Sequence, residues 1–276
     1  MTLLQQMLSS YPVTTSEQAD QALREVMQEI ALAGLNRGGF FEHAAFYGGT
    51  CLRVFYELPR YSEDLDFSLL RVDPEFSLEP YFKAVREEFS ALGIDVEVST
   101  KIKSAASQIE SAFVKNNTRI FDIHLQDKRQ IKIKFEVDTQ PPLGFVTEEK
   151  LLLQPFSFYV KCFSLQDLYA GKMHALLYRQ WKNRVKGRDW YDFEWYVRRG
   201  VLLNLAHFTQ RARQSGGLSE ITLSEFDFKA MLRKKIESLD VSSAKKDIER
   251  FILDPRALDI WSQAYFLQLV EMIKFQ

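Results

Sequence analysis

Cysteine is scarce in this 276-residue sequence, which holds only two, Cys51 and Cys162. The two cysteines lie far apart in the sequence and have neither CxxC spacing nor a histidine cluster beside them. We therefore expect no disulfide scaffold and no structural zinc site, and a reducing cytoplasm fits this cysteine usage best.

Signals for export and membrane insertion are lacking as well. The N-terminal segment has no basic start followed by a long apolar core, and no later stretch approaches the roughly twenty apolar residues that span a bilayer. We expect neither secretion nor membrane insertion, and hence a cytoplasmic location. The formal net charge of -1 gives no global reason to predict nucleic-acid binding, so such a role has to depend on local patches.

The composition that is present, 46% hydrophobic and 26% charged, is that of a folded globular chain and argues against disorder. A chain of this length holds one large or two modest domains. Amphipathic patterns predict helices over residues 16–33 and 80–92, and three β-like runs follow over 94–100, 113–125 and 131–139. After residue 163 the patterns are helical, which places a domain boundary near residue 160.

The segment 45–70 reads as a strand, a glycine turn, a short helix, a loop and a second strand. Gly48, Gly49 and Thr50 form the turn, and the free backbone N–H groups at the following helix start favour an anion such as a phosphate. Asp64 and Asp66 share one face of the second strand because alternate strand residues point the same way. The segment therefore predicts that a phosphate and a divalent metal meet in one cleft.

A third acid comes from the run IKIKFEVDT at residues 131–139, in which apolar and polar residues alternate with a period of two. Glu136 and Asp138 share its polar face. If this strand lies beside Asp64 and Asp66, one of the two completes a set of three carboxylates, and spacing alone does not say which. The alternative is a solvated outer face.

Nucleotidyl transfer explains why these residue types occur in this order. Mg²⁺ prefers a few carboxylates together with substrate phosphates, and two ions about 4 Å apart can hold the attacking and leaving oxygens. Asp64 and Asp66 would bridge two Mg²⁺ ions, with Glu136 on the acceptor side and an NTP as the substrate. A bare DxD or a lone GGT is common by chance, so the prediction depends on the ordered set.

Five segments resemble the AbiEii/AbiGii-type nucleotidyltransferase toxins of the DNA polymerase β-like superfamily over about residues 45–195. They are GGT, SEDLDF, KFEVD, SLQDLYAGKMHALLYR and KGRDWYDF. The resemblance implies an α+β fold with a nucleotidyltransferase-type mixed sheet and covering helices over residues 1–160, and an all-helical C-terminal domain over 161–276. It also implies a toxin of a type IV toxin-antitoxin or abortive-infection system in phage defence, with a cognate antitoxin as a partner. Some members transfer nucleotides to tRNA 3′ ends, and others prefer GTP.

Matched position by position, the resemblance assigns roles to residues in four motifs. The glycine motif falls on Gly48, Gly49 and Thr50; the metal-binding pair on Asp64 and Asp66; the third motif on Leu165, Asp167, Ala170, Lys172 and Ala175; and the fourth on Arg188, Asp189, Tyr191 and Asp192. Lys172 and Asp189 become candidates for catalysis, and Arg188 and Asp192 for nucleotide binding.

Each of these residues also has a plain structural interpretation. Lys172 can be a solvated helix lysine, Asp189 an N-cap, and Asp192 a partner for Arg188 or Arg179. An ion pair between Asp189 and Lys172 would reconcile the catalytic and structural interpretations. Arg53, one helical turn after Thr50, either reaches the triphosphate or is solvated.

The segment 179–188 is the best local candidate for RNA contact. It combines five basic residues with an aromatic one, a combination that suits a phosphate backbone and a stacked base. These residues are Arg179, Trp181, Lys182, Arg184, Lys186 and Arg188.

The function predicted from the sequence is Mg²⁺-dependent transfer of NMP from NTP to an RNA acceptor, with tRNA as the expected acceptor. One alternative keeps the fold and makes the chain a protein nucleotidylyltransferase or a GTP-using phosphotransferase. Another is a nucleotide-binding module without catalysis. The four histidines have no mutual metal-ligand spacing, and no hydrolase triad is indicated.

Overall fold

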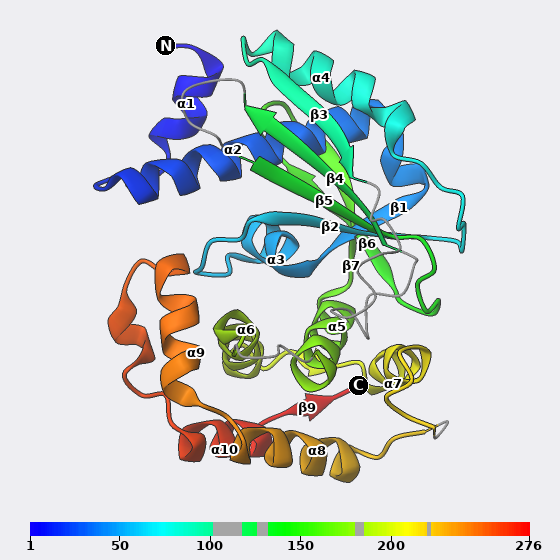
Figure 1. Cartoon of the computed structure of the whole chain (residues 1–276), viewed down its shortest axis with the longest axis vertical. Helices are drawn as coiled ribbons and strands as arrows, with labels where there is room; N and C mark the ends of the chain where they lie inside the picture. The colour runs from blue at the N-terminus through cyan, green and yellow to red at the C-terminus, as the bar shows by residue number, and fades with distance from the viewer. Residues whose placement is uncertain (102–117, 126–131, 180–184, 220–221) are drawn as a thin grey trace. The chain divides into compact units, whose positions relative to one another are not determined.

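The computed structural model describes residues 1–101, 118–125, 132–179, 185–219 and 222–276 (Figure 1). These residues form two compact units. Unit 1 comprises Met1–Tyr56, Ser62–Leu143 and Thr147–Cys162, and unit 2 comprises Glu57–Tyr61, Gly144–Val146 and Phe163–Gln276. The short segments 57–61 and 144–146 belong to unit 2, although the division predicted from the sequence placed them in the first domain.

Unit 1 is built on a mixed sheet whose seven described strands run in the order β3-β4-β5-β2-β1-β7-β6 (Figure 1). The strands are β1 (Ala44–Tyr47), β2 (Asp64–Leu69), β3 (Val96–Lys101), β4 (Thr118–Leu125), β5 (Lys132–Asp138), β6 (Thr147–Leu152) and β7 (Phe158–Phe163). β2 pairs antiparallel with β1 and parallel with β5, and β7 pairs parallel with β1. The predicted α+β fold with a mixed sheet is confirmed.

Strands β4 and β5 fall within two of the β-like runs of the sequence, and β3 overlaps the run 94–100 and ends one residue beyond it, whereas β6 and β7 were not predicted. β6 has the sequence TEEKLL and lies at the edge of the sheet, where charged side chains are common and the alternation of apolar residues is weak. Its sequence therefore carries little strand signal. The first residues of the β-like run 113–125, residues 113–117, lie outside the described residues, and so does Ile131 at the start of the third run.

The core of unit 1 forms because β5 alternates strictly between buried and half-buried residues. Phe135 is fully buried, and its ring stacks on Phe67 of β2 with 6.3 Å between centroids. The helices of unit 1 are α1 (Leu3–Ser9), α2 (Ser16–Arg37), α3 (Gly48–Tyr56) and α4 (Phe82–Ala91). α2 and α4 pack closely because Gly34 has no Cβ; one placed there would lie only 2.6 Å from the Cα of Val85.

Unit 2 is mainly helical. Its helices are α5 (Leu165–Tyr178), α6 (Gly187–Arg198), α7 (Leu205–Gln214), α8 (Glu225–Glu237), α9 (Val241–Ile248) and α10 (Gln263–Glu271). α5 begins at the predicted N-cap Ser164, and its Tyr169 stacks on Tyr196 of α6 at 4.3 Å. The structure adds a short parallel pair, β8 (Leu202–Leu203) and β9 (Lys274–Phe275), which the sequence does not predict because strands of two residues have no period.

Short 3-10 helices occur at Phe40–Glu42, Glu79–Tyr81, Glu249–Phe251 and Pro255–Leu258. Within the described ranges, no helix has the length and apolar character needed to cross a lipid bilayer.

Candidate functional site

The glycine turn of unit 1 joins β1 directly to α3. Gly48 has a φ of +84°, a left-handed conformation that favours glycine, and α3 starts at this residue. Gly49 lies in the first turn of the helix. Thr50 is fully buried, and its hydroxyl donates a hydrogen bond to the backbone carbonyl of Asp64. This bond ties the first turn of α3 to the start of β2.

The two aspartates of β2 lie beside the acidic strand β5, as the register shows. Asp64 pairs with Lys134, Asp66 with Glu136, and Ser68 with Asp138. Residues at paired positions of neighbouring strands present their side chains on the same face. Asp64, Asp66 and Glu136 therefore share one face.

Asp138 is further along the strand than Glu136, and its carboxylate has a local role. Its Oδ1 accepts a hydrogen bond of 3.1 Å from the backbone N–H of Gln140, just beyond the end of β5. Such a bond stabilises the turn that follows the strand. Of the two acids that spacing left open, Glu136 is the one directly across from Asp66.

A lysine of the same polar strand face, to which the sequence assigned no role, lies among these acids. The ammonium of Lys134 forms an ion pair with the carboxylate of Glu136. Burial alone would lower the pKa of Lys134, but the charges of Glu136, Asp64 and Asp66 raise it above its usual value. Lys134 was detectable in the sequence, because in an alternating strand it shares the polar face with Glu136 two residues later.

The donors present in unit 1 suit a hard divalent cation such as Mg²⁺. Among the described residues, no set of three His, Cys, Asp or Glu side chains is already gathered around one metal position. Mg²⁺ does not need such a cage, because it is usually held by one or two carboxylates, water and substrate phosphates. Gly48 also provides a cradle for Asp66, since a Cβ on Gly48 would overlap with the Asp66 carboxylate. The residues fit a site that the substrate completes.

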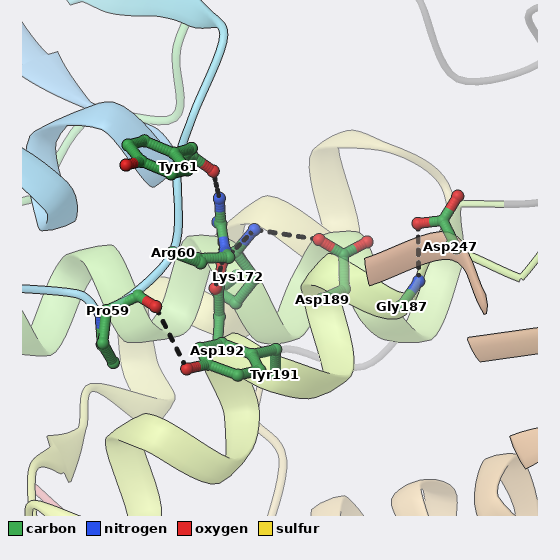
Figure 2. Close-up of polar contacts among 9 residues, drawn as sticks. All are labelled: Pro59, Arg60, Tyr61, Lys172, Gly187, Asp189, Tyr191, Asp192 and Asp247. Atoms are coloured by element: carbon green, nitrogen blue, oxygen red, sulfur yellow. Dashed lines mark hydrogen bonds and ion pairs between the residues drawn. The ribbon is translucent and has the colours of Figure 1, made fainter. Parts of the chain in front are cut away.

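Unit 2 places Lys172 in a buried ion-pair network, drawn in Figure 2. Its Nζ lies 2.9 Å from Oδ1 of Asp189 and 2.8 Å from Oδ2 of Asp192. Asp192 also accepts two hydrogen bonds of 2.6 Å from Nε and Nη2 of Arg60. The side chain of Lys172 is only 14% exposed, so it is not a solvated helix lysine.

The charges of this network compensate one another. Burial would lower the pKa of Lys172, but Asp189 and Asp192 raise it above the usual range. Burial would raise the pKa of Asp192, but Arg60 and Lys172 lower it below its usual range. Lys172, Asp192 and Arg60 are therefore ionised at neutral pH, and the network pairs two basic side chains with two acidic ones.

The plain interpretations of the two aspartates need correction. α6 starts at Gly187 with Lys186 at the N-cap position, so Asp189 lies inside the first turn and is not the cap. The Asp192 partners that the structure defines are Arg60 and Lys172. The ion pair between Asp189 and Lys172 is present, so the lysine is held by the motif that follows it.

Arg60 is a functional candidate that sequence reasoning missed. It belongs to the strap, by which we mean residues 57–61, between α3 and β2. The only sequence signal was an arginine four positions before Asp64, in a loop. Its partner Asp192 is 132 positions away, and no local pattern links the two.

The remaining arginine candidates have defined neighbours. Arg53 is paired with the buried Glu25 of α2, with Nε 2.6 Å and Nη2 3.2 Å from the two carboxylate oxygens. It is therefore not simply solvated, and its part in nucleotide binding stays a prediction. The guanidinium of Arg188 lies over the ring of Phe251 at 4.3 Å. Half of the basic segment, residues 180–184, lies outside the described residues.

The histidines of unit 2 are buried and neutral. His174 shares a 2.9 Å hydrogen bond with the hydroxyl of Ser215, and burial, followed by the charge of Arg211, lowers its pKa to about 3. Burial likewise lowers the pKa of His207 to about 3. Neither ring is charged at neutral pH, so neither can attract a phosphate as a cation.

Comparison with known proteins places this geometry in a family. The family model described as the nucleotidyl transferase AbiEii toxin of type IV toxin-antitoxin systems matches residues 30–266. No curated protein matches the chain.

One solved structure shares the fold, and two others are similar. The nucleotidyltransferase toxin MenT4 from Mycobacterium tuberculosis is 15% identical with a TM-score of 0.54, and the match covers 98% of this chain and 88% of MenT4. A putative nucleotidyltransferase from Helicobacter pylori is 18% identical with a TM-score of 0.49, and the match covers 90% of this chain and 89% of that chain. JHP933 from Helicobacter pylori is 17% identical with a TM-score of 0.49, and the match covers 90% of this chain and 87% of that chain. Because the family model spans most of the chain, the protein belongs to the AbiEii family of nucleotidyltransferase toxins from type IV toxin-antitoxin systems.

Proposed function

We propose that this protein transfers NMP from an NTP to an RNA acceptor, with tRNA as the preferred acceptor, in a reaction that needs Mg²⁺. The observation that carries the proposal is the register of β2 and β5, which puts Glu136 directly across from Asp66 beside the glycine turn. Membership of a nucleotidyltransferase toxin family supports the use of an NTP. The reaction takes place in the cytoplasm, where NTPs and tRNA are found, and a cognate antitoxin counteracts it.

In this proposal, unit 1 holds the metal and the triphosphate. Asp64, Asp66 and Glu136 hold two Mg²⁺ ions, which would neutralise the phosphate oxygens and lower the barrier to attack on the α-phosphorus. The backbone N–H groups of Gly49 and Thr50 bind a phosphate at the start of α3. Glu136 accepts the proton of the attacking RNA hydroxyl, whose oxygen bonds to the α-phosphorus as the bond to the β-phosphate breaks and pyrophosphate leaves. Asp138 ends the strand and is not a ligand.

The helical unit supplies charge to the triphosphate. The Lys172 ammonium binds phosphate oxygens, where the low local dielectric strengthens the interaction, and Asp189 and Asp192 hold the lysine in place. Arg188 and Arg53 assist nucleotide binding. The basic residues of segment 179–188 contact the RNA backbone.

The test is label transfer from α-³²P-NTPs to total tRNA with Mg²⁺. Asp66→Ala and Glu136→Ala should lower the incorporation rate at least about a hundredfold, because each removes a group that acts on the reacting phosphate. Asp138→Ala is the comparison on the same strand, and Glu149→Ala changes an exposed acid of β6. Both should keep near wild-type rates.

The outcomes separate the parts of the proposal. Absence of transfer with every NTP and acceptor would refute it. Label on protein in place of RNA would refute the RNA acceptor and support the protein nucleotidylyltransferase alternative. Activity that survives Glu136→Ala but not Asp138→Ala would overturn the assignment of the third carboxylate.

A further inference from the structure

The side chain of Arg60 is the most completely enclosed cation of the ion-pair network in unit 2. It is 2% exposed, and Asp192 is fully buried beside it. The guanidinium donates from Nε and Nη2 to the two oxygens of the Asp192 carboxylate, each at 2.6 Å, and from Nη1 to the backbone carbonyl of Tyr61 at 2.9 Å. Two parallel hydrogen bonds fix both the position and the plane of a carboxylate.

The orientation of Asp192 in turn determines what Lys172 meets. The oxygen Oδ2 of Asp192 is shared, since it lies 2.6 Å from Nη2 of Arg60 and 2.8 Å from Nζ of Lys172 (Figure 2). The other contact of the ammonium is Oδ1 of Asp189 at 2.9 Å. If the Asp192 carboxylate rotated, Lys172 would lose one of these two anchors.

Arg60 also sets the charge that surrounds the lysine. Without it, two carboxylates would enclose a single ammonium, and the negative excess would hold that ammonium more tightly. The charge of Arg60 works against the rise that Asp189 and Asp192 cause in the pKa of Lys172. A lysine that must bind a triphosphate needs an ammonium that is held in place but not fully neutralised by its own protein.

The strap backbone is anchored independently of the Arg60 side chain. The N–H of Tyr61 donates to the carbonyl of Phe251 at 2.7 Å, and the hydroxyl of Tyr191 donates to the carbonyl of Pro59 at 3.3 Å. The backbone of Arg60 forms an antiparallel bridge with Ile252. A change in the Arg60 side chain therefore leaves several strap contacts in place.

We propose that Arg60 is a positioning residue for Lys172, acting through Asp192: its bidentate bond orients the Asp192 carboxylate, and this carboxylate orients the lysine ammonium for the nucleotide. The nucleotide part rests on the proposed function of Lys172. The strap thus has a task besides linking α3 to β2.

The first measurement reads Lys172 itself and does not depend on catalysis. Trace acetylation with acetic anhydride at several pH values, followed by peptide mass spectrometry, reports the pKa and accessibility of Lys172 in the full chain. Arg60→Gln should raise the pKa of Lys172, and a rise of one unit slows acetylation about tenfold at neutral pH. Arg60→Gln combined with Asp192→Asn removes the excess negative charge and should restore most of the reactivity.

The second measurement is the NTP KM and kcat of the same variants. Arg60→Gln should raise KM about tenfold or more, because a displaced ammonium no longer meets the phosphate. Arg60→Lys keeps the charge but loses the bidentate hydrogen bonding of the guanidinium, so its KM should lie between those of the wild type and Arg60→Gln. Arg198→Gln is the matched control; its arginine is 71% exposed in a pair with Glu194. It should match the wild type in both measurements.

Two outcomes would overturn the proposal in whole or in part. A lower melting temperature in Arg60→Gln with unchanged Lys172 acetylation and KM would refute the positioning role and leave a purely structural one. Changed acetylation with an unchanged KM would support positioning while refuting the nucleotide part. In that case Lys172→Ala should also leave KM unchanged, which identifies the failure as one of the proposed Lys172 function.

Discussion

Replacing Gly48 with alanine tests whether the glycine turn exists to make room for Asp66. The residue has a φ of +84°, and the left-handed conformation alone costs an alanine about 1–2 kcal/mol. The new Cβ would also overlap with the Asp66 carboxylate and lie 3.0 Å from its Cβ and Cγ, so the whole side chain has to move. Overpacking of this kind costs about 1–3 kcal/mol more. We expect a total loss of about 2–5 kcal/mol.

The matched control is Gly93→Ala, in the same unit. Gly93 has a φ of +71°, but nothing lies within 4 Å of the position of its Cβ. It should lose only the conformational part, about 1–2 kcal/mol. Thermal unfolding separates the two variants, since each kcal/mol lowers Tm by roughly 2–4 °C in a domain of 150–250 residues.

A second assay follows the metal. Mn²⁺ titration by electron paramagnetic resonance should show at least about tenfold weaker binding in Gly48→Ala, because Asp66 is displaced, and wild-type binding in Gly93→Ala. Equal losses of stability in the two variants would refute the steric argument. Wild-type Mn²⁺ affinity in Gly48→Ala would show that metal binding does not depend on the position of the Asp66 side chain beside Gly48.

Three further predictions concern single side chains. Burial, followed by the charge of Glu25, raises the pKa of Glu29 to about 7. The stability linked to this group is fully present below its unfolded-state pKa of 4.5 and is lost as the pH rises through its folded-state pKa of about 7. In urea unfolding, Glu29→Gln should therefore be more stable than the wild type by up to about 3 kcal/mol at pH 8, and not at pH 5. Without nucleotide, Lys134→Met should bind Mn²⁺ about fivefold more tightly than the wild type, because a competing cation is removed from Glu136. Lys161→Met, on β7, should bind Mn²⁺ as the wild type does, and equal affinities of the Lys134→Met variant and the wild type would refute this competition. Gly187→Ala places a Cβ against the carbonyl of Ala244 and should lower Tm and NTP affinity together, while Gly171→Ala, with open space at its Cβ, should keep both or raise Tm.

Local patterns explain what could be predicted about the acidic site. Asp64 and Asp66 share one face of β2, and Glu136 and Asp138 share one face of β5, because the period of a strand is two wherever the strand lies. The choice between Glu136 and Asp138 needed the register of β2 with β5, which is a contact between residues about seventy positions apart. The same alternation places Lys134 on this face, but only the folded structure shows its ion pair with Glu136.

Helix ends and short strands also divide into features set by local sequence and features set by contacts between distant residues. The N-cap Ser164 was predicted correctly, since capping depends on residues within one turn. β6 was not predicted, because an edge strand such as TEEKLL has one solvated face and weak alternation. The short pair β8 and β9 exists only because residues 202–203 and 274–275 meet in the folded chain.

By itself, the sequence determined the fold class, the glycine turn, the paired aspartates and the nucleotidyltransferase family, because each depends on local spacing or on motifs in a fixed order. Only the tertiary structure decided that Asp66 faces Glu136, that Arg53 is bound to Glu25, and that Lys172 is held by two aspartates with Arg60 behind one of them. The physical reason is that a buried charge takes its partner from whatever the packed chain brings within reach. For Arg60 that partner is 132 positions away, a distance over which no sequence periodicity acts.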